Sequence, residues 1–275
     1  MGAVNITPDS FSEGFSLVPD ECVGLALKLI EEGADIVDLG AESTRPGSRA
    51  GGPDAQVSSD EEQARLLPVL ERILRSRTDA VLSVDTYKAA TARAALKAGA
   101  EIINDVSGFR WEPAIAEVCA EFQAGVVLSH TRGRPDEWRE QPQLEQDEVL
   151  AMVRDGLASS IAAARRAGIA DQAIVLDPGY GFGKRFGENY ALLARQNELL
   201  ALERPLLVGL SRKSFLGHTL APLFGGEPAP TDARGNASLA AMTAAILNGA
   251  SIVRVHAVRP AVEAARVADA IVERA

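Results

Sequence analysis

Ala80-Val-Leu-Ser-Val-Asp-Thr86 contains a short apolar run followed by a polar residue that can bind or donate, and eight runs of this kind occur along the chain. The other runs are Gly2–Val4, Ala34–Val37, Ile102–Ile103, Val126–Leu128, Ala173–Leu176, Leu206–Leu210 and Ile252–Val255. The polar residues that close or follow the runs are Asn5, Asp38 with Glu42, Asp85, Asn104 with Asp105, His130, Asp177, Ser211 and His256. Eight strands alternating with helices predict an α/β fold, the (β/α)8 TIM barrel, in which the strand C-termini share one face. We therefore expect these polar residues to surround one pocket.

Helical spacing of apolar residues separates the runs. The expected helices are 20–32, 60–76, 87–98, 112–122, 145–167, 189–203, 236–248 and 260–273. Asp20 and Ser58 precede two of them and are typical start signals. Segments Arg45–Pro53 and Phe224–Pro230 are rich in glycine and proline, which predicts long, mobile connections. The first of these joins the second strand to its helix and is expected to cover a substrate.

Composition predicts one soluble domain over residues 1–275, because 47% of the residues are hydrophobic and 24% are charged. The net charge of −10 argues against nucleic acid or an anionic membrane as the main partner. Cys22 and Cys119 are expected to be reduced thiols in or near the core, and we expect a cytoplasmic protein without membrane spans or a signal peptide. The first strand begins at Met1, which suggests that a native N-terminal extension is missing.

Two carboxylates and one amide end the third, fourth and sixth runs: Asp85, Asn104 and Asp177. A carboxylate can pair with two adjacent N–H donors of a heterocycle, and an amide can serve a donor and an acceptor at once. The set therefore suits a guanidine-like aminopyrimidine. The alternative is that these residues are helix N-caps.

Cations follow three other strands: Arg45, Lys213, and Arg254 with His256. In an acidic protein their convergence predicts a site for a phosphate or diphosphate, whereas Arg212 is equally consistent with a surface cation. Asn5 offers a neutral oxygen that Mg²⁺ accepts when phosphates supply most of its ligands. The alternative for Asn5 is a turn residue before Thr7-Pro8-Asp9.

Gly179-Tyr-Gly-Phe-Gly-Lys184 is similar to a phosphate-binding loop, but its spacing matches no nucleotide motif. We interpret it as a close-approach loop that presents Phe182 as an aromatic wall. His130 and His218 are expected to be hydrogen-bonded structural residues more often than catalysts. The sequence contains three histidines in all, which argues against a zinc site.

Seven segments, in order, resemble the motifs of the dihydropteroate synthase family. They are Asn5–Ser12, Asp38–Gly47, Ser83–Thr86, Ile103–Gly108, Asp177–Lys184, Ser211–Ser214 and Arg254–His256. The resemblance covers the whole chain. It implies a transferase of folate synthesis and a sulfonamide target, which condenses 7,8-dihydropterin pyrophosphate with para-aminobenzoate and releases pyrophosphate. It also implies a homodimer.

The resemblance also implies a role for each matching residue. The pterin is expected on Asp85, Asn104, Asp177 and Lys213, with Arg254 stacked on its ring, and pyrophosphate with Mg²⁺ on Asn5, Arg45, Arg254 and His256. The para-aminobenzoate pocket is expected to comprise Phe11, Thr44, Pro46, Phe182 and Ser211. No serine, cysteine or lysine is paired with an evident base, so we expect dissociative loss of pyrophosphate and not a covalent enzyme intermediate.

The chain departs from the family pattern at three positions: Ser129 replaces a common methionine, Ala41 a glycine and Ala257 an aspartate. Two rival functions stay open at this point. One is a pterin-dependent methyltransferase, which would need no diphosphate clamp. The other is a pterin-binding paralogue without turnover. The helix at 236–248 is apolar nearly all round, which predicts that it helps to bury a two-fold dimer interface.

Overall fold

Eight parallel strands, paired in sequence order, form the centre of the molecule in the computed structural model, which describes residues 1–6, 19–44, 48, 50 and 57–274. The strands are β1 (Gly2–Asn5), β2 (Ile36–Gly40), β3 (Val81–Asp85), β4 (Ile102–Asp105), β5 (Gly125–Ser129), β6 (Ile174–Asp177), β7 (Leu206–Val208) and β8 (Ala250–Val253). A parallel bridge joins Gly2 of β1 to Val255, which lies two residues after the end of β8. The sheet therefore closes, and the predicted TIM barrel is confirmed.

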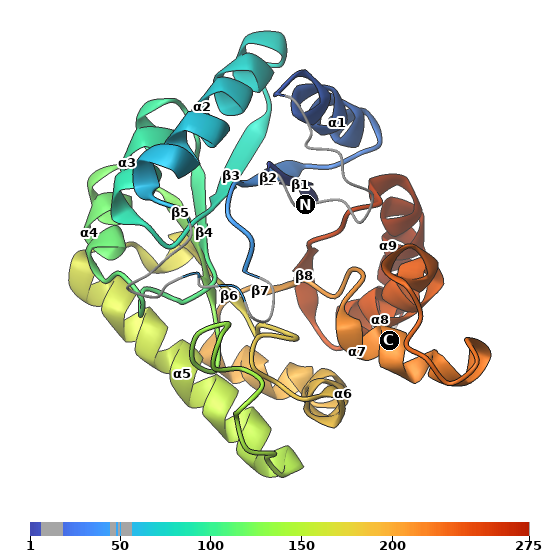
Figure 1. Cartoon of the computed structure of the whole chain (residues 1–275). Coiled ribbons are helices and arrows are strands. Elements are labelled where there is room, and N and C mark those ends of the chain that lie inside the picture. The colour runs from blue at the N-terminus through green and yellow to red at the C-terminus, as the bar shows by residue number, and fades with distance from the viewer. Residues whose placement is uncertain (7–18, 45–47, 49, 51–56, 275) are drawn as a thin grey trace.

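Nine α-helices lie outside the strands in the described part of the chain (Figure 1). They are α1 (Pro19–Glu31), α2 (Ser59–Ser76), α3 (Ala89–Lys97), α4 (Ala114–Glu121), α5 (Gln146–Ala167), α6 (Phe186–Ala194), α7 (Ser214–Thr219), α8 (Gly235–Leu247) and α9 (Val258–Val272). Short 3₁₀ segments are η1 (Asp171–Ala173), η2 (Gln196–Leu202), η3 (Ala221–Leu223) and η4 (Thr231–Arg234).

The helix expected at 189–203 is wrong in two respects: α6 begins earlier, at Phe186, and the second half is the 3₁₀ segment η2. Gln196 explains the break, because its buried amide donates hydrogen bonds to the carbonyls of Ala245 and Asn248 on and after α8. The sequence analysis did not predict α7, whose six residues are too few to display a helical period.

Side chains along each strand alternate between the barrel interior and the surrounding helices, as strand geometry requires. In β3, Leu82 and Val84 are fully buried in the cluster formed between strands and helices, while the Ser83 hydroxyl donates to Asp38, its register partner on the neighbouring strand β2. A smaller apolar cluster contains Met1, Val127 and Leu207. The interior is thus polar towards the C-terminal ends of the strands, where the site residues lie.

Ser58 caps α2, as its sequence predicts: its Oγ accepts a hydrogen bond of 3.2 Å from the Glu61 amide. Asp20 instead lies inside the first turn of α1, which begins at Pro19. We expect Ser58→Ala to lower the free energy of unfolding by about 1 kcal/mol, since it leaves an N-terminal amide without its acceptor. Urea unfolding followed by circular dichroism measures this.

Ser76→Ala, at the other end of the same helix, is the matched control for the capping prediction. The Ser76 hydroxyl only donates to the Arg72 carbonyl in an exposed position. Equal destabilisation by the two variants would contradict the proposed capping contribution.

Both cysteines are free and buried, in agreement with the sequence analysis. Burial raises the pKa of Cys119 to about 12, so this thiol is unreactive at neutral pH. Of the described helices, none combines the length and apolar character needed to cross a membrane.

Most of the Arg45–Pro53 connection lies outside the described residues. In the Phe224–Pro230 connection, the amide of buried Ala229 bonds to the Gly217 carbonyl of α7.

Candidate active site

The three residues predicted to face a heterocycle lie at the same end of the barrel. Asp85 is the last residue of β3 and pairs in register with Asn104 of β4, and Asp177 is the last residue of β6. None of them caps a helix: the N-cap residues of α3, α4 and α6 are Lys88, Pro113 and Arg185. The helix-capping alternative is therefore wrong for all three.

Arg254, immediately after β8, reaches across the barrel to two of its carboxylates. Its Nε donates to Asp38 Oδ2 at 2.6 Å, and one terminal nitrogen donates to Asp85 Oδ2 at 3.1 Å. Burial lowers the pKa of Arg254, but the charges of Asp38 and Asp85 outweigh this and raise it overall. The guanidinium therefore stays charged and is held between β2 and β3.

Burial raises the pKa of both acids that end β3 and β6. For Asp85, Arg254 opposes the effect of burial and Asp38 adds to it. For Asp177, the hydrogen bond from the Gly179 amide to its Oδ1, at 2.7 Å, opposes burial, as does the charge of Lys213. Each carboxylate is thus poorly solvated, which strengthens its interaction with any N–H donor that enters the site.

Lys213 and Phe182 are in direct contact on this face of the barrel. The Lys213 Nζ lies 3.8 Å from the centroid of the Phe182 ring, and Trp138 packs on that ring at a centroid distance of 5.4 Å. Phe182 is half-buried, as expected of an aromatic wall. Burial lowers the pKa of Lys213 to about 8, although Asp177 raises it. A cation of lowered pKa beside a carboxylate is typical of a functional site.

Ser211 and His256 form a second pair on this face. The Ser211 Oγ lies 2.9 Å from the His256 Nδ1 and thereby orients the imidazole. Asn5 ends β1 on the same edge of the barrel. Phe11, Arg45 and Pro46 lie outside the described residues, so the structure does not position them.

Thr44 is half-buried and follows a segment with an ionic anchor. Within that anchor the Lys88 Nζ lies 2.6 Å from a Glu42 carboxylate oxygen and 3.2 Å from Glu62 of α2. Both acids and the lysine are almost completely buried. The anchor fixes the start of the connection that carries Thr44.

Two polar residues that follow the runs serve the fold instead of the pocket. The Asp105 carboxylate is fully buried and accepts hydrogen bonds from the amides of Ser107 and Phe109. His130 is buried against Gly156 of α5, and burial lowers its pKa well below the usual value. The prediction that all polar residues at the strand ends face one pocket is wrong for these two. The other histidine considered in the sequence analysis, His218, packs its ring against Phe186.

The sequence analysis placed Asp38 among the polar residues around the pocket but assigned it no contact, and it assigned no role to Lys184. Asp38 was taken to follow a strand, whereas it lies in the middle of β2 with its side chain inside the barrel. The Lys184 Nζ donates to the backbone carbonyls of Gly179 and His130, at 2.8 and 3.1 Å, and thereby holds the loop that carries Phe182. Strand alternation is the signal that could have placed Asp38, because it puts the Asp38 side chain on the same face of β2 as the strand-end residue Gly40.

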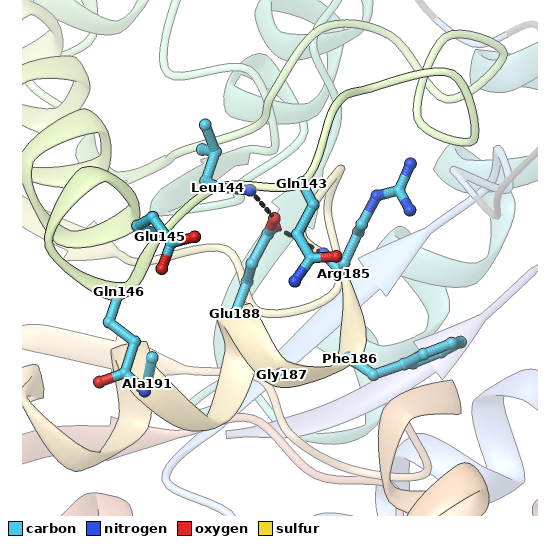
Figure 2. Close-up of a pocket in the computed structure, with 9 residues that line it drawn as sticks. All are labelled: Gln143, Leu144, Glu145, Gln146, Arg185, Phe186, Gly187, Glu188 and Ala191. Atoms are coloured by element: carbon cyan, nitrogen blue, oxygen red, sulfur yellow. Dashed lines mark hydrogen bonds between the residues drawn. The ribbon is translucent and has the colours of Figure 1, made fainter.

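A separate cavity of about 340 Å³ lies between the N-termini of α5 and α6 (Figure 2). Its Glu188 accepts hydrogen bonds from the amides of Leu144 and Arg185, and Glu148 accepts one from Glu145 at the start of α5. The helix ends are therefore already satisfied by acids. No predicted site residue lines this cavity.

Within the described ranges, no three or more His, Cys, Asp and Glu side chains are grouped closely enough to hold a metal ion.

Comparison with known proteins agrees with this geometry. The family described as pterin binding enzyme matches residues 1–256. The dihydropteroate synthase of Escherichia coli K12 is 43% identical over 98% of this chain and 90% of its own length. The chain belongs to the dihydropteroate synthase family of pterin-binding enzymes.

Solved structures of dihydropteroate synthases share the fold of the chain. The Yersinia pestis enzyme, solved with a sulfonamide drug complex, has a TM-score of 0.89 and 38% identity, over all of this chain and 93% of that one. The Xanthomonas albilineans enzyme, solved with 7,8-dihydropteroate, has a TM-score of 0.81 and 38% identity, over 98% and 92% of the two chains.

Proposed function

We propose that the chain catalyses the dihydropteroate synthase reaction, joining 6-hydroxymethyl-7,8-dihydropterin diphosphate to para-aminobenzoate. The observation that carries this function is the Arg254 guanidinium held between Asp38 and Asp85 on the barrel face that also presents Asp177 and Lys213. Acids for a heterocycle and cations for a leaving diphosphate thus occur on one face. The relatives named above support the synthase over a pterin-dependent methyltransferase.

The pterin ring is proposed to lie among Asp85, Asn104, Asp177 and Lys213. A pterin carries N–H donors on its aminopyrimidine edge, and two poorly solvated carboxylates match them as acceptors. Lys213 would donate to a ring acceptor, and Arg254 would stack on the ring face. Ser129, in place of the methionine common in the family, provides less apolar contact for the ring.

The diphosphate is proposed to lie towards Arg254, His256 and Arg45. Mg²⁺ would be carried by the diphosphate, with the Asn5 amide oxygen as one ligand, and would neutralise charge on the leaving group. His256, oriented by Ser211, can donate a hydrogen bond from its other ring nitrogen to a phosphate oxygen.

The reaction is proposed to begin with cleavage of the bond between the pterin methylene carbon and the diphosphate oxygen. The electron pair leaves with pyrophosphate, and the electron-rich pterin stabilises the positive methylene carbon. The amine of para-aminobenzoate then supplies its lone pair to form the C–N bond and loses a proton. The residues are proposed to act by position and charge. The Ser211 hydroxyl does lie 2.9 Å from the His256 Nδ1, a pairing that the sequence analysis did not expect, but the proposed step forms no bond to the enzyme.

A test of this order of events is isotope exchange. Labelled pyrophosphate should enter the dihydropterin diphosphate in the absence of para-aminobenzoate, because cleavage precedes attack. Absence of exchange, together with kinetic isotope effects typical of an associative transition state, would contradict the dissociative mechanism.

The para-aminobenzoate pocket is proposed to comprise Thr44, Phe182 and Ser211 together with Phe11 and Pro46. Phe182 supplies an apolar wall, and the nearby Lys213 offers a positive charge. Because the Yersinia pestis relative was solved with a sulfonamide drug complex, we propose that sulfonamides compete with para-aminobenzoate at this pocket. Competitive inhibition kinetics measure this.

Activity is expected to fall as the pH rises above about 8. The pKa of the Lys213 ammonium is lowered to about 8, because burial and the charge of Arg254 together outweigh the opposing charges of Asp177 and Asp85. Because lysine donates to the pterin only when protonated, kcat/KM for the pterin substrate declines as the pH rises through this pKa. The measurement is the kcat/KM profile at constant ionic strength.

Lys213→Arg tests the assignment of that decline. Arginine keeps its charge over the whole range, so the alkaline decline should move upward by at least about one pH unit, whatever the absolute activity. An unchanged decline in the variant would mean that another group titrates.

We propose further that the chain is a homodimer through α8 and α9. The side chains of Leu247 on α8 and of Val267 and Ile271 on α9 are about half exposed or more, and the two helices pack together. Light scattering at micromolar concentration should give twice the mass of the chain, and Leu247→Glu with Val267→Glu should give a monomer. Leu223→Glu, on exposed η3, is the control that should leave the dimer intact. A monomeric wild type would contradict the proposal.

The cytoplasm is the proposed location, because the two buried cysteines are free thiols, as a reducing compartment favours. The proposed partners are the two small-molecule substrates and a second copy of the chain.

A further inference from the structure

Asp38 is a carboxylate with no solvent exposure in the middle of the barrel. Its Oδ1 accepts a hydrogen bond of 2.6 Å from the Ser83 hydroxyl. Its Oδ2 accepts from the Asn104 amide nitrogen at 3.2 Å and from the Arg254 Nε at 2.6 Å. One buried side chain on β2 thus contacts β3, β4 and the residue after β8.

The contact with Asn104 fixes which way that amide points. A carboxylate can only accept hydrogen bonds, so the atom of Asn104 that faces Asp38 must be the NH₂ group. No hydrogen bond to the Asn104 Oδ1 occurs within the part of the chain that the structure describes. Asn104 therefore keeps its oxygen and one N–H for a ligand.

The contact with Arg254 fixes the plane of its guanidinium. Asp38 holds Nε, and Asp85 holds one terminal nitrogen, so two points of a planar, rigid group are anchored to different strands. The Arg254 side chain is 20% exposed, so part of the guanidinium remains accessible to a ligand. Removing one anchor would free the plane to rotate about the other.

The charge of Asp38 also matters. Arg254 is surrounded by low-dielectric protein, and the nearby negative charges keep it protonated despite burial. Asp38 supplies that compensation from a position that no solvent reaches, whereas Asp85 is 26% exposed. When a pterin engages Asp85, Asp38 remains as the fixed partner of the guanidinium.

We propose that Asp38 is a positioning residue of the pterin pocket, which fixes the plane of the Arg254 guanidinium and the orientation of the Asn104 amide. It acts through these two side chains and does not itself touch the substrate. The inference rests on the proposed function, because it assigns the two oriented groups to pterin binding.

Asp38→Asn separates charge from hydrogen bonding. An asparagine can keep all three contacts: its oxygen accepts from Arg254 and Asn104, and its nitrogen donates to Ser83, whose hydroxyl can also accept. We expect kcat/KM for the pterin substrate to fall about 10- to 100-fold, because the Arg254 contact loses its charge-assisted character. The KM for para-aminobenzoate should change less than about twofold, since additive behaviour is expected of separate groups.

Asp105→Asn is the matched control. Asp105 is another fully buried carboxylate, on β4, but its hydrogen bonds go only to Ser107 and Phe109 in its own turn. This variant should lose stability while kcat/KM for the pterin substrate per folded molecule stays unchanged. Equal losses of kcat/KM in the two variants would show that Asp38 is merely structural.

A double-mutant cycle with Arg254→Ala gives the decisive comparison. If Asp38 acts through Arg254, adding Asp38→Asn to Arg254→Ala should lower kcat/KM by less than about threefold. The double variant should also have a higher Tm than Arg254→Ala alone, which leaves a buried carboxylate without its cation. A loss as large in the Arg254→Ala background as in the wild type would overturn the proposal. If Asp38→Asn alone does not fold, the comparison of Arg254→Ala with the double variant still decides.

Calorimetric binding of 6-hydroxymethylpterin distinguishes this proposal from the proposed function. Weaker pterin binding by Asp38→Asn with no turnover in the wild type would support the positioning role and contradict the synthase activity. Unchanged pterin binding and kcat/KM in Asp38→Asn, with an active wild type, would overturn the positioning role alone.

Discussion

Asp177→Asn is expected to lower kcat/KM for the pterin substrate by about 10³-fold or more, because the new amide NH₂ group would face an N–H donor of the pterin. The Asp177 Oδ1 accepts a hydrogen bond from the Gly179 amide, and an asparagine oxygen can also accept this hydrogen bond. The second carboxylate oxygen is replaced by an NH₂ group, which donates where the pterin also donates. Steady-state kinetics with a pyrophosphate-coupled assay measures the loss.

Folding should not suffer from the same change. Burial raises the pKa of Asp177, so the folded state disfavours its charge relative to the unfolded chain. A neutral isostere therefore removes no net stabilisation, and the Tm should stay close to that of the wild type. Asp155→Asn, on the exposed side of α5, is the control that should change neither property. An Asp177→Asn variant with normal kcat/KM would contradict the pterin assignment.

Lys213→Met is expected to lower kcat/KM about 10²- to 10³-fold, the loss typical of removing one partner of a buried charged hydrogen bond. The ammonium lies beside the Phe182 ring and within the field of Asp177. It is the group proposed to donate to the pterin ring. Methionine keeps the length and the apolar stem of the side chain but removes the donor.

The same variant should be as stable as the wild type or more stable. Burial lowers the pKa of Lys213, which means that the fold disfavours its charge. A residue whose removal costs activity but not stability is retained for function. Lys28→Met on α1, where the lysine side chain is 68% exposed, serves as the control. A large drop in Tm for Lys213→Met alone would indicate a structural role instead.

The sequence predicted the barrel because each strand is an apolar run followed by a helical period, and both signals are local. Such a run does not show at which residue the strand ends, because a strand can continue into polar residues. The second run was expected to stop at Val37, but β2 continues to Gly40 and includes Asp38. The partners that stabilise this buried charge come from Ser83, Asn104 and Arg254, and no local pattern indicates them.

The same reason explains the break after α6 and the role of Lys184. The amide of Gln196 bonds to carbonyls on and after α8, about fifty residues later in the chain, and the Lys184 Nζ bonds to the carbonyl of His130. Contacts between distant segments decide these features. By contrast, Asp85, Asn104 and Asp177 could be predicted as a group, because strand C-termini share one face in this fold.

The two rivals differ from the synthase in the fate of the diphosphate. A paralogue without turnover would bind the pterin and release nothing. A methyltransferase would transfer a methyl group to a corrinoid and would make no use of the cations around Arg254.

Pyrophosphate release by the purified protein, with dihydropterin diphosphate and Mg²⁺ and with or without para-aminobenzoate, tests the proposed activity most directly. The account predicts release that depends on para-aminobenzoate and equals the dihydropteroate formed, and that is nearly lost in Asp177→Asn and Lys213→Met. Pterin binding without pyrophosphate release would contradict it, and a corrinoid methyl-transfer assay would then distinguish the two rivals.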